Sequence, residues 1–171
     1  STLISSDPFK YYNVDTIGTH TDDSNQKIYW FIKSQNYGTI VEYSVLTGSS
    51  VIVLETLNNV LNFSREHLIT GVVKMINGDP SKDLLVWTDD YNPPRMINIE
   101  RAKADTLNSV VYTEDDISLI KKPPRYAPTT TPTNVAGVGD ESLKDRFISF
   151  ATRYKYLDGE YSALSSFTNY T

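Results

Sequence analysis

The chain has 171 residues, a formal net charge of −5 and no cysteine, which excludes disulfide bonds, thiolate zinc sites and thiol catalysis. Acidic residues outnumber basic ones by 12 to 7 in residues 1–100, and each kind numbers 9 in residues 101–171. Neither part has the basic excess of a protein that binds nucleic acid tightly. No apolar run in the sequence is long enough for a membrane-spanning segment. The 12 tyrosines suit pleated, half-buried surfaces, so the composition predicts an all-β fold.

Residues 1–12 are expected to form an extended entry segment, followed by a β region over residues 13–120. The first strand of this region, residues 13–23, ends in the turn cluster Asp22-Asp23-Ser24-Asn25. A hairpin then joins residues 28–32 to residues 40–46 around Gly38. A buried strand is predicted for residues 51–55.

The second half of the β region repeats strands and turns. A strand is predicted for residues 69–76, and a second hairpin joins residues 84–88 to residues 96–99 across the rigid pair Pro93-Pro94. Two stretches stay open. Residues 57–63 have helical apolar spacing but three asparagines, and residues 100–110 could form either a helix or a loop with one turn.

Trp30 and Trp87 lie 57 positions apart in two similar stretches, each with an apolar strand, a short turn-rich gap and a second strand. A unit that recurs in this way cannot bury its apolar face alone and must stack on its neighbours. β-Propeller blades behave so. The pattern predicts incomplete propeller-like blades over residues 13–120, with chance similarity between two hairpins as the alternative.

A linker rich in Pro, Thr and Gly is predicted for residues 121–140, because such a stretch cannot form a packed core. Residues 141–171 are expected to begin a second β module. Residues 146–156 alternate with period two, and Asp158-Gly159 supplies the positive φ angles of a tight turn. We therefore expect an antiparallel hairpin that brings Tyr156 close to Tyr161.

The sequence predicts no catalytic residue, no cofactor and no metal site. Asp89 and Asp90 follow a strand, where adjacent side chains point to opposite faces, so they cannot share a proton. We expect them to cap a turn. His20 and His67 are the only histidines, and neither has a partner at ligand spacing. Neither a nucleophile elbow nor a phosphate-binding glycine loop occurs in the sequence.

Two surface patterns have both a functional and a structural interpretation. The basic stretch from Lys121 to Tyr126 could contact phosphate or an acidic partner, but we expect solvated charges on a linker. Tyr154, Tyr156 and Tyr161 could form a platform for sugar or protein, and tyrosines with packed rings and wet hydroxyls are the commoner arrangement.

Residues 85–100 and 145–165 resemble segments of a large tail protein of crAss-like bacteriophages, the stabilisation or muzzle protein at the distal end of a short tail. The resemblance covers about residues 20–170 and implies a role similar to that of the propeller-based nozzle proteins of other short-tailed phages. The hairpin of residues 153–162 resembles those of fibronectin-type sandwich modules. The chain starts with Ser and is shorter than a full muzzle subunit, so we expect a fragment or the ordered part of one.

The resemblance implies a structural virion protein in a ring around the DNA exit channel, and not an enzyme. Its partners would be other copies of itself and other tail proteins, with double-stranded DNA passing through without specific binding. The acidic excess of residues 1–100 is consistent with such a channel wall. The rival interpretation is a bacterial cell-surface propeller module that recognises glycan or protein through exposed aromatic side chains.

Overall fold

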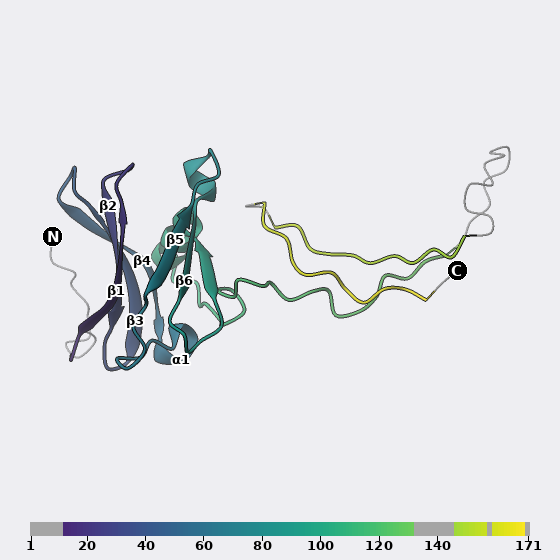
Figure 1. Cartoon of the computed structure of the whole chain (residues 1–171), viewed down its shortest axis with the longest axis horizontal. Coiled ribbons are helices and arrows are strands. Elements are labelled where there is room, and N and C mark those ends of the chain that lie inside the picture. Colours follow the sequence, from purple (N-terminus) through teal and green to yellow (C-terminus); the bar gives the residue numbers. More distant parts are fainter. Residues whose placement is uncertain (1–11, 132–145, 157–158, 170–171) are drawn as a thin grey trace. The chain divides into compact units, whose positions relative to one another are not determined.

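The computed structural model describes residues 12–131, 146–156 and 159–169 of the chain. The chain divides into two units, Ser1–Leu119 and Ile120–Thr171, each of which is described by itself (Figure 1). The predicted entry segment, apart from its last residue, lies outside the described residues. The same holds for residues 132–145, from the predicted linker and second module, and for residues 157–158 of the predicted turn.

The first unit contains two antiparallel sheets, in which neighbouring strands follow one another along the chain. The first sheet consists of β1 (Asp15–Asp22), β2 (Lys27–Lys33), β3 (Tyr37–Ser44) and β4 (Ser49–Leu57). The second consists of β5 (Gly71–Met75), β6 (Leu84–Thr88) and β7 (Arg95–Asn98). Both predicted hairpins are confirmed, and the prediction of a mostly β fold is confirmed with them.

Three short helices join or follow the strands: α1 (Asn58–Leu61), η1 (Pro80–Lys82) and α2 (Ile99–Leu107). The two stretches that the sequence left open therefore differ. Within residues 57–63, Asn58–Leu61 form a single helical turn that stops at Asn62 in the left-handed region, with φ 49°. Residues 99–107 form a helix that the Asn98 side chain caps by accepting a hydrogen bond from the Arg101 amide at 2.9 Å.

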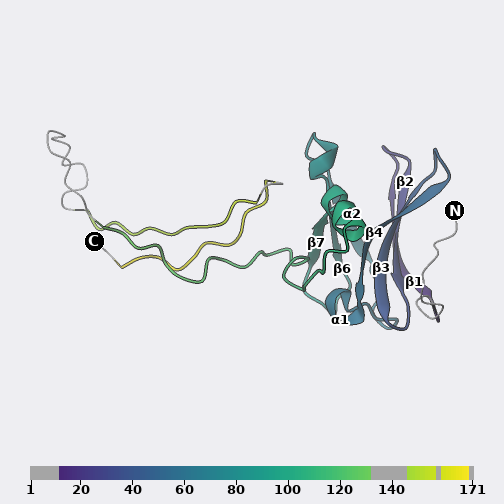
Figure 2. The same ribbon diagram turned by 180° about the vertical axis from the view of Figure 1, so that it is seen from behind.

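The two sheets and α2 enclose one apolar core (Figure 2). At its centre the Phe31 ring of β2 lies 5.6 Å from the Trp87 ring of β6, and 6.1 Å from that of Phe63. Ala102 places the buried side of α2 against the same core. The other core side chains are Ile17, Tyr29, Ile40, Val53, Leu54, Leu61, Ile69, Leu85, Ile97, Ile99, Tyr112 and Ile117. The first unit is thus one packed body rather than two separate hairpins.

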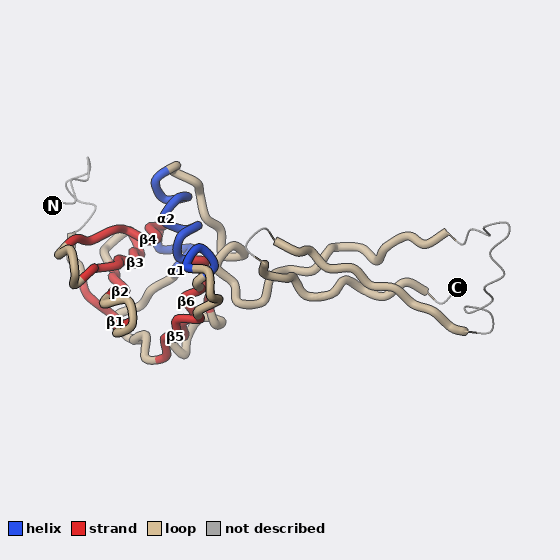
Figure 3. The backbone as a smooth tube through the Cα atoms, turned by 90° about the horizontal axis from the view of Figure 1, so that it is seen from above, coloured by secondary structure: helices blue, strands red, loops and turns tan. Residues whose placement is uncertain are grey.

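The second sheet packs on the first with its strands in the same sequential order. Where β1 and the start of β5 meet, the Ile69 amide donates to the Ile17 carbonyl at 2.9 Å, and Lys74 bonds Asp22 at 2.6 Å. Both pairs are separated by 52 residues, so the two strands run in the same direction. At the other side, α2 packs against β4, where the Thr106 hydroxyl donates to the Val53 carbonyl at 3.1 Å (Figure 3). Each sheet thus runs in the same order from one side of the stack to the other.

The second unit contains extended segments rather than regular strands. An antiparallel bridge joins Lys155 to Tyr161, and the Tyr156 amide donates to the Glu160 carbonyl at 2.9 Å, so the two segments pair antiparallel as predicted but are not the regular strands that the alternation predicted. Gly159 has φ 89°, the left-handed conformation that glycine adopts most easily. In the predicted linker, the carbonyl of Lys121 accepts a hydrogen bond from the Ala163 amide at 3.0 Å. This described start of the linker therefore pairs with the hairpin.

A ladder of hydroxyl groups replaces half of the backbone bonds in this hairpin. Ser162, Ser165 and Thr168 each donate their amide to the carbonyl of one residue of the other segment and accept that residue's amide on their hydroxyl oxygen. The partners are, in the same order, Tyr154, Thr152 and Phe150, with distances of 2.8–3.0 Å. One segment therefore advances three residues while the other advances two, a spacing that suits a polyproline-like conformation.

Replacing Ser165 with Ala should weaken this ladder locally. The Thr152 amide loses its acceptor, the Ser165 hydroxyl oxygen at 3.0 Å, and a hydrogen bond of this kind contributes about 1 kcal/mol. We expect the Thr152 amide to exchange its hydrogen roughly fivefold faster, as measured by NMR. The exposed neighbour Ser166, replaced with Ala, is the control and should leave that rate unchanged. Equal protection in the two variants would contradict the role of the hydroxyl.

Replacing Gly18 with Ala should destabilise the contact between the sheets. A Cβ at Gly18 would lie 2.7 Å from the Ile69 Cβ and 2.9 Å from its carbonyl oxygen, so the backbone that leads into β5 must move. We expect the free energy of unfolding in urea to fall by about 2 kcal/mol. In the matched control, Gly71→Ala, the new Cβ meets only the Thr88 methyl group, which can turn away, so a smaller loss is expected. Losses of equal size would show that the close approach at Gly18 is unimportant.

Candidate functional site

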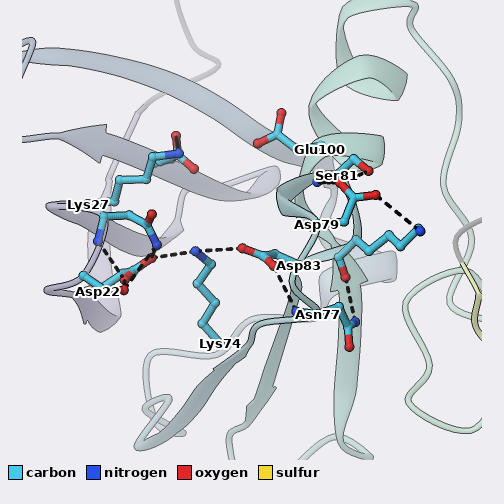
Figure 4. A network of polar contacts seen from close by, with 12 residues as sticks. Asp22, Lys27, Lys74, Asn77, Asp79, Ser81, Asp83 and Glu100 are labelled. Atoms are coloured by element: carbon cyan, nitrogen blue, oxygen red, sulfur yellow. Dashed lines mark hydrogen bonds and ion pairs between the residues drawn. The ribbon is translucent and has the colours of Figure 1, made fainter.

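A buried ionic cluster joins the two sheets where β1 ends (Figure 4). The ammonium group of Lys74, on β5, lies 2.6 Å from a carboxylate oxygen of Asp22 and 3.1 Å from one of Asp83. All three side chains are less than a tenth exposed. Asp22 also accepts bonds from the Ser24 hydroxyl and from Asn25, so the predicted turn cluster supplies part of this site. The charges of Lys74, Asp22 and Asp83 are therefore paired within the protein.

A second cluster joins the first sheet to α2. The Glu42 carboxylate, on β3, accepts bonds at 2.9 Å from Lys27, from Lys103 and from the hydroxyl of Tyr29. Lys103, on α2, also bonds Glu100 at 2.8 Å. Since Glu42 is buried, removal of its charge would leave the two ammonium groups without their main partner.

The ionisable groups of these two clusters are held in their charged states. Burial opposes ionisation of Asp22, but the bonds from Lys74, Ser24 and Asn25 outweigh it, so the pKa of Asp22 lies well below its usual range. Burial likewise opposes the charge on Lys74, and Asp22 and Asp83 outweigh it and raise its pKa. For Glu42 the bonds from Lys103, Lys27 and Tyr29 overcome burial and lower the pKa. Such groups hold the two sheets and α2 together by ion pairing and do not donate protons near neutral pH.

The residues that the sequence singled out for chemistry do not converge. The Asp89 carboxylate accepts bonds from the amides of Tyr91 and Asn92 at 3.1 and 2.7 Å, which confirms its turn-capping role. Asp90 adopts φ 57° and is exposed. His20 lies beside Tyr29, with ring centroids 6.4 Å apart. Across the described ranges no three His, Cys, Asp or Glu side chains gather as metal ligands, and no helix is long and apolar enough to cross a membrane.

His67 takes part in an arrangement that the sequence did not suggest. Its ring stacks on that of Tyr91, with centroids 4.5 Å apart and an interplanar angle of 12°. The pair borders an open cleft of about 510 Å³ whose lining also includes Lys33 and Arg65. Arg65 bonds the Asp15 carboxylate, and burial together with Arg65 lowers the pKa of Lys33. The two aromatic residues lie 24 positions apart in the sequence, so no local sequence pattern predicts their contact.

The first sheet has an apolar face that the second sheet does not cover. Along β2, Tyr29 and Phe31 point into the shared core, so Trp30 points the other way. Trp30 stacks on Tyr43 with centroids 5.5 Å apart, and Val41 is buried beside them without belonging to the shared core. We call this the Trp30 face; strand register gives it the side chains Ile28, Trp30, Ile32, Val41, Tyr43 and Ile52, with Thr19 and Thr21 on β1.

The second sheet also has an apolar face that is only partly covered, since Leu84 and Met96 on it are each 8% exposed. Val73 and Met75, on β5, are 59% and 47% exposed, whereas Trp87 and Leu85, on β6, point into the core. Across the strands, Val73 pairs with Val86, which pairs with Met96. We call this the Val73 face; it consists of Val73, Met75, Leu84, Val86 and Met96. The stack of sheets is therefore apolar on both of its outer sides.

The second unit buries no apolar side chain among its described residues. Its buried residues there are Lys121, Ser162 and Ser165. Arg153 covers the ring of Tyr161, with 4.0 Å between the guanidinium carbon and the ring centroid, and Arg125 lies over Tyr126 at 5.5 Å. Large exposed side chains include Tyr126, Phe147, Phe150, Tyr154, Leu164 and Phe167. In its described residues this unit exposes its large apolar side chains instead of enclosing them in a core.

Replacing Glu42 with Gln should lower stability and flatten its dependence on pH. Because the pKa of Glu42 is lowered on folding, its carboxylate stabilises the protein above the ordinary value near 4.5, and this contribution is lost as the pH falls below that value. At pH 7 we expect a loss of about 2 kcal/mol from the unsatisfied ammonium groups, and a shallower decline toward pH 3. Urea midpoints measured between pH 7 and pH 3 test this. The control is Glu66→Gln, at an exposed position, and the prediction is wrong if its profile matches that of Glu42→Gln.

Compared with protein-family models, with curated proteins and with solved structures, the chain matches none. The features that bear on its function are therefore those of the molecule itself. They are two buried ionic clusters whose charges are satisfied internally, one open cleft with an aromatic pair, and apolar surfaces on both outer sides of the stacked sheets.

Proposed function

We propose that this chain is a structural protein of a phage virion, a muzzle- or nozzle-type component of a short tail. It assembles with other copies of itself and with other tail proteins around the DNA exit channel. The observation that carries the proposal is the apolar character of both outer sides of the sheet stack: Val73 is 59% exposed on one side, and on the other the half-buried Trp30 stacks on Tyr43. A protein built for assembly needs such surfaces, whereas one that works alone rarely exposes them on two sides.

The fold fits incomplete propeller blades. The two sheets have the same strand order, β1 and β5 run in the same direction, and Trp30 and Trp87 each lie on the second strand of their sheet. In the second sheet, α2 follows β7 and packs beside β4, where a blade would place its outermost strand. Blades related in this way bury their faces only against one another.

The charges fit a wall along which DNA moves without binding. In the sheet unit Lys27, Lys74 and Lys103 are each paired with carboxylates, and residues 1–100 carry an acidic excess. Tight binding of DNA requires many unneutralised cations on one surface. The same saturation of charge by internal partners supports a non-enzymatic role, since an acid or base catalyst needs a group with an intermediate pKa.

The second unit fits a module that is completed in the assembly. Its hairpin exposes Tyr154 and Tyr161, and its described residues lack an apolar core. We propose that the hairpin begins a sandwich module of the fibronectin type, whose second layer comes from neighbouring protein. Burial of the exposed rings would then contribute the stabilisation that the isolated unit lacks.

A cell-surface module that binds glycan or protein is the second candidate. The observation that favours it is the cleft beside His67 and Tyr91, because a flat aromatic pair next to polar groups is a suitable platform for a sugar ring. Lys33 and Arg65 on the same cleft would favour an acidic sugar.

Locating the chain in purified phage particles tests the proposal. Antibodies to the chain should label the distal end of the tail in electron micrographs, and mass spectrometry should find it in stoichiometric amounts. Labelling of the outer membrane of uninfected bacteria would overturn the proposal. Binding of acidic oligosaccharides to the full chain, lost on Tyr91→Ala but kept on Tyr126→Ala, would then support the second candidate.

A further inference from the structure

We propose that copies of this chain stack head to tail, with the Trp30 face of one copy on the Val73 face of the next. This inference rests on the proposed function only in that both require self-assembly, and it concerns which surfaces make the contact. Its starting point is the internal contact between the two sheets, which shows how one sheet of this kind seats on another.

The internal contact has a defined direction. Sheet one presents Phe31 to sheet two, and sheet two presents Trp87 to sheet one, with the rings 5.6 Å apart. The strands at one side run in the same direction, as the bonds from Ile69 to Ile17 and from Lys74 to Asp22 show. Opposite sides of the two sheets therefore meet, as in a stack of identical layers, and no twofold axis relates them.

The same relation defines the equivalent outer faces. Trp87 lies on the second strand of its sheet and points toward the first sheet, which covers it. Trp30 lies on the second strand of its sheet and also points backward along the stack, where the described residues provide no preceding sheet. At the forward end, the Val73 face is equivalent to the Phe31 side of sheet one. If the contact between the two sheets is repeated between two copies, the Val73 face of one copy packs on the Trp30 face of the next.

The occupant to which the structure points is a second copy of this chain. The longest stretches outside the described residues, 1–11 and 132–145, are too short to supply a multi-stranded sheet of their own. A second copy offers both faces in the required order. It also matches them chemically, since the Trp30–Tyr43 pair would seat on branched and flexible aliphatic side chains such as Val73 and Met75.

A contact between two different faces does not stop at a dimer. Each added copy presents a new Trp30 face at one end and a new Val73 face at the other. Such an assembly closes into a ring if the rotation per copy divides a full turn, and otherwise grows as a filament.

Charge substitutions on one face at a time test the inference on the full chain. One variant carries Val73→Glu and Met75→Glu, both at exposed positions of the second sheet. The other carries Thr19→Glu and Thr21→Glu, exposed positions that border Trp30 and Ile28. The control is Leu46→Glu with Leu107→Glu, which are 74% and 84% exposed and lie on neither face. Far-ultraviolet circular dichroism and a cooperative urea transition verify folding of each variant.

Analytical ultracentrifugation should find the control and the unmodified chain in species larger than a dimer. Each face variant alone should be a monomer. An equimolar mixture of the two should form a dimer and nothing larger, since one intact Trp30 face and one intact Val73 face remain. A dimer of either variant alone, a mixture that stays monomeric, or a control that dissociates would each overturn the inference.

These outcomes are separate from those for the proposed function. If the chain is missing from phage particles, the virion role fails while the mixing experiment still reports on the contact. If the mixture stays monomeric although the chain labels the tail, the virion role stands and the head-to-tail contact is wrong.

Discussion

A β-sheet whose two faces are both apolar must be covered on both sides, and this constraint governs the first unit. The sheet of β1–β4 buries Phe31 and Tyr29 on one side and gathers Trp30, Tyr43 and Val41 on the other. The sheet of β5–β7 supplies the cover for the first of these sides. It is itself apolar on its far side, so every layer added satisfies one face and exposes another.

The buried ion pairs set how the layers meet. Apolar faces alone attract one another without regard to direction, and several sliding positions would bury similar areas. Lys74 between Asp22 and Asp83, and Glu42 between Lys27 and Lys103, are satisfied in one position only. Displacement would leave charges buried without partners, which costs far more than the lost apolar contact. The ionic clusters thus contribute specificity, while the aromatic contact of Phe31 with Trp87 contributes cohesion.

The strands could be predicted because their signals are local, whereas the contacts between them could not. Turn residues such as Asp22–Asn25 and the alternating apolar residues marked the strands, and Trp30 and Trp87 indeed occupy the second strand of their sheets. The sequence could not show that these two side chains point outward and inward, because apolar residues flank Trp30 on both faces of β2. Lys74 and Asp22 are 52 residues apart, and the His67–Tyr91 stack depends on tertiary structure. The spacing of Ser162, Ser165 and Thr168 was visible, but alternation with period two concealed its meaning.

The hydroxyl ladder of the second unit has a consequence for length variation. One segment advances by three residues per rung and the other by two, so their repeat lengths differ. An insertion beside Ser165 keeps the rungs aligned only when it adds a multiple of three residues, with a Ser or Thr at each third place. On the side of Thr152 the compatible unit is two residues. Related chains that lengthen this hairpin should therefore grow in steps of five residues, three on one segment and two on the other.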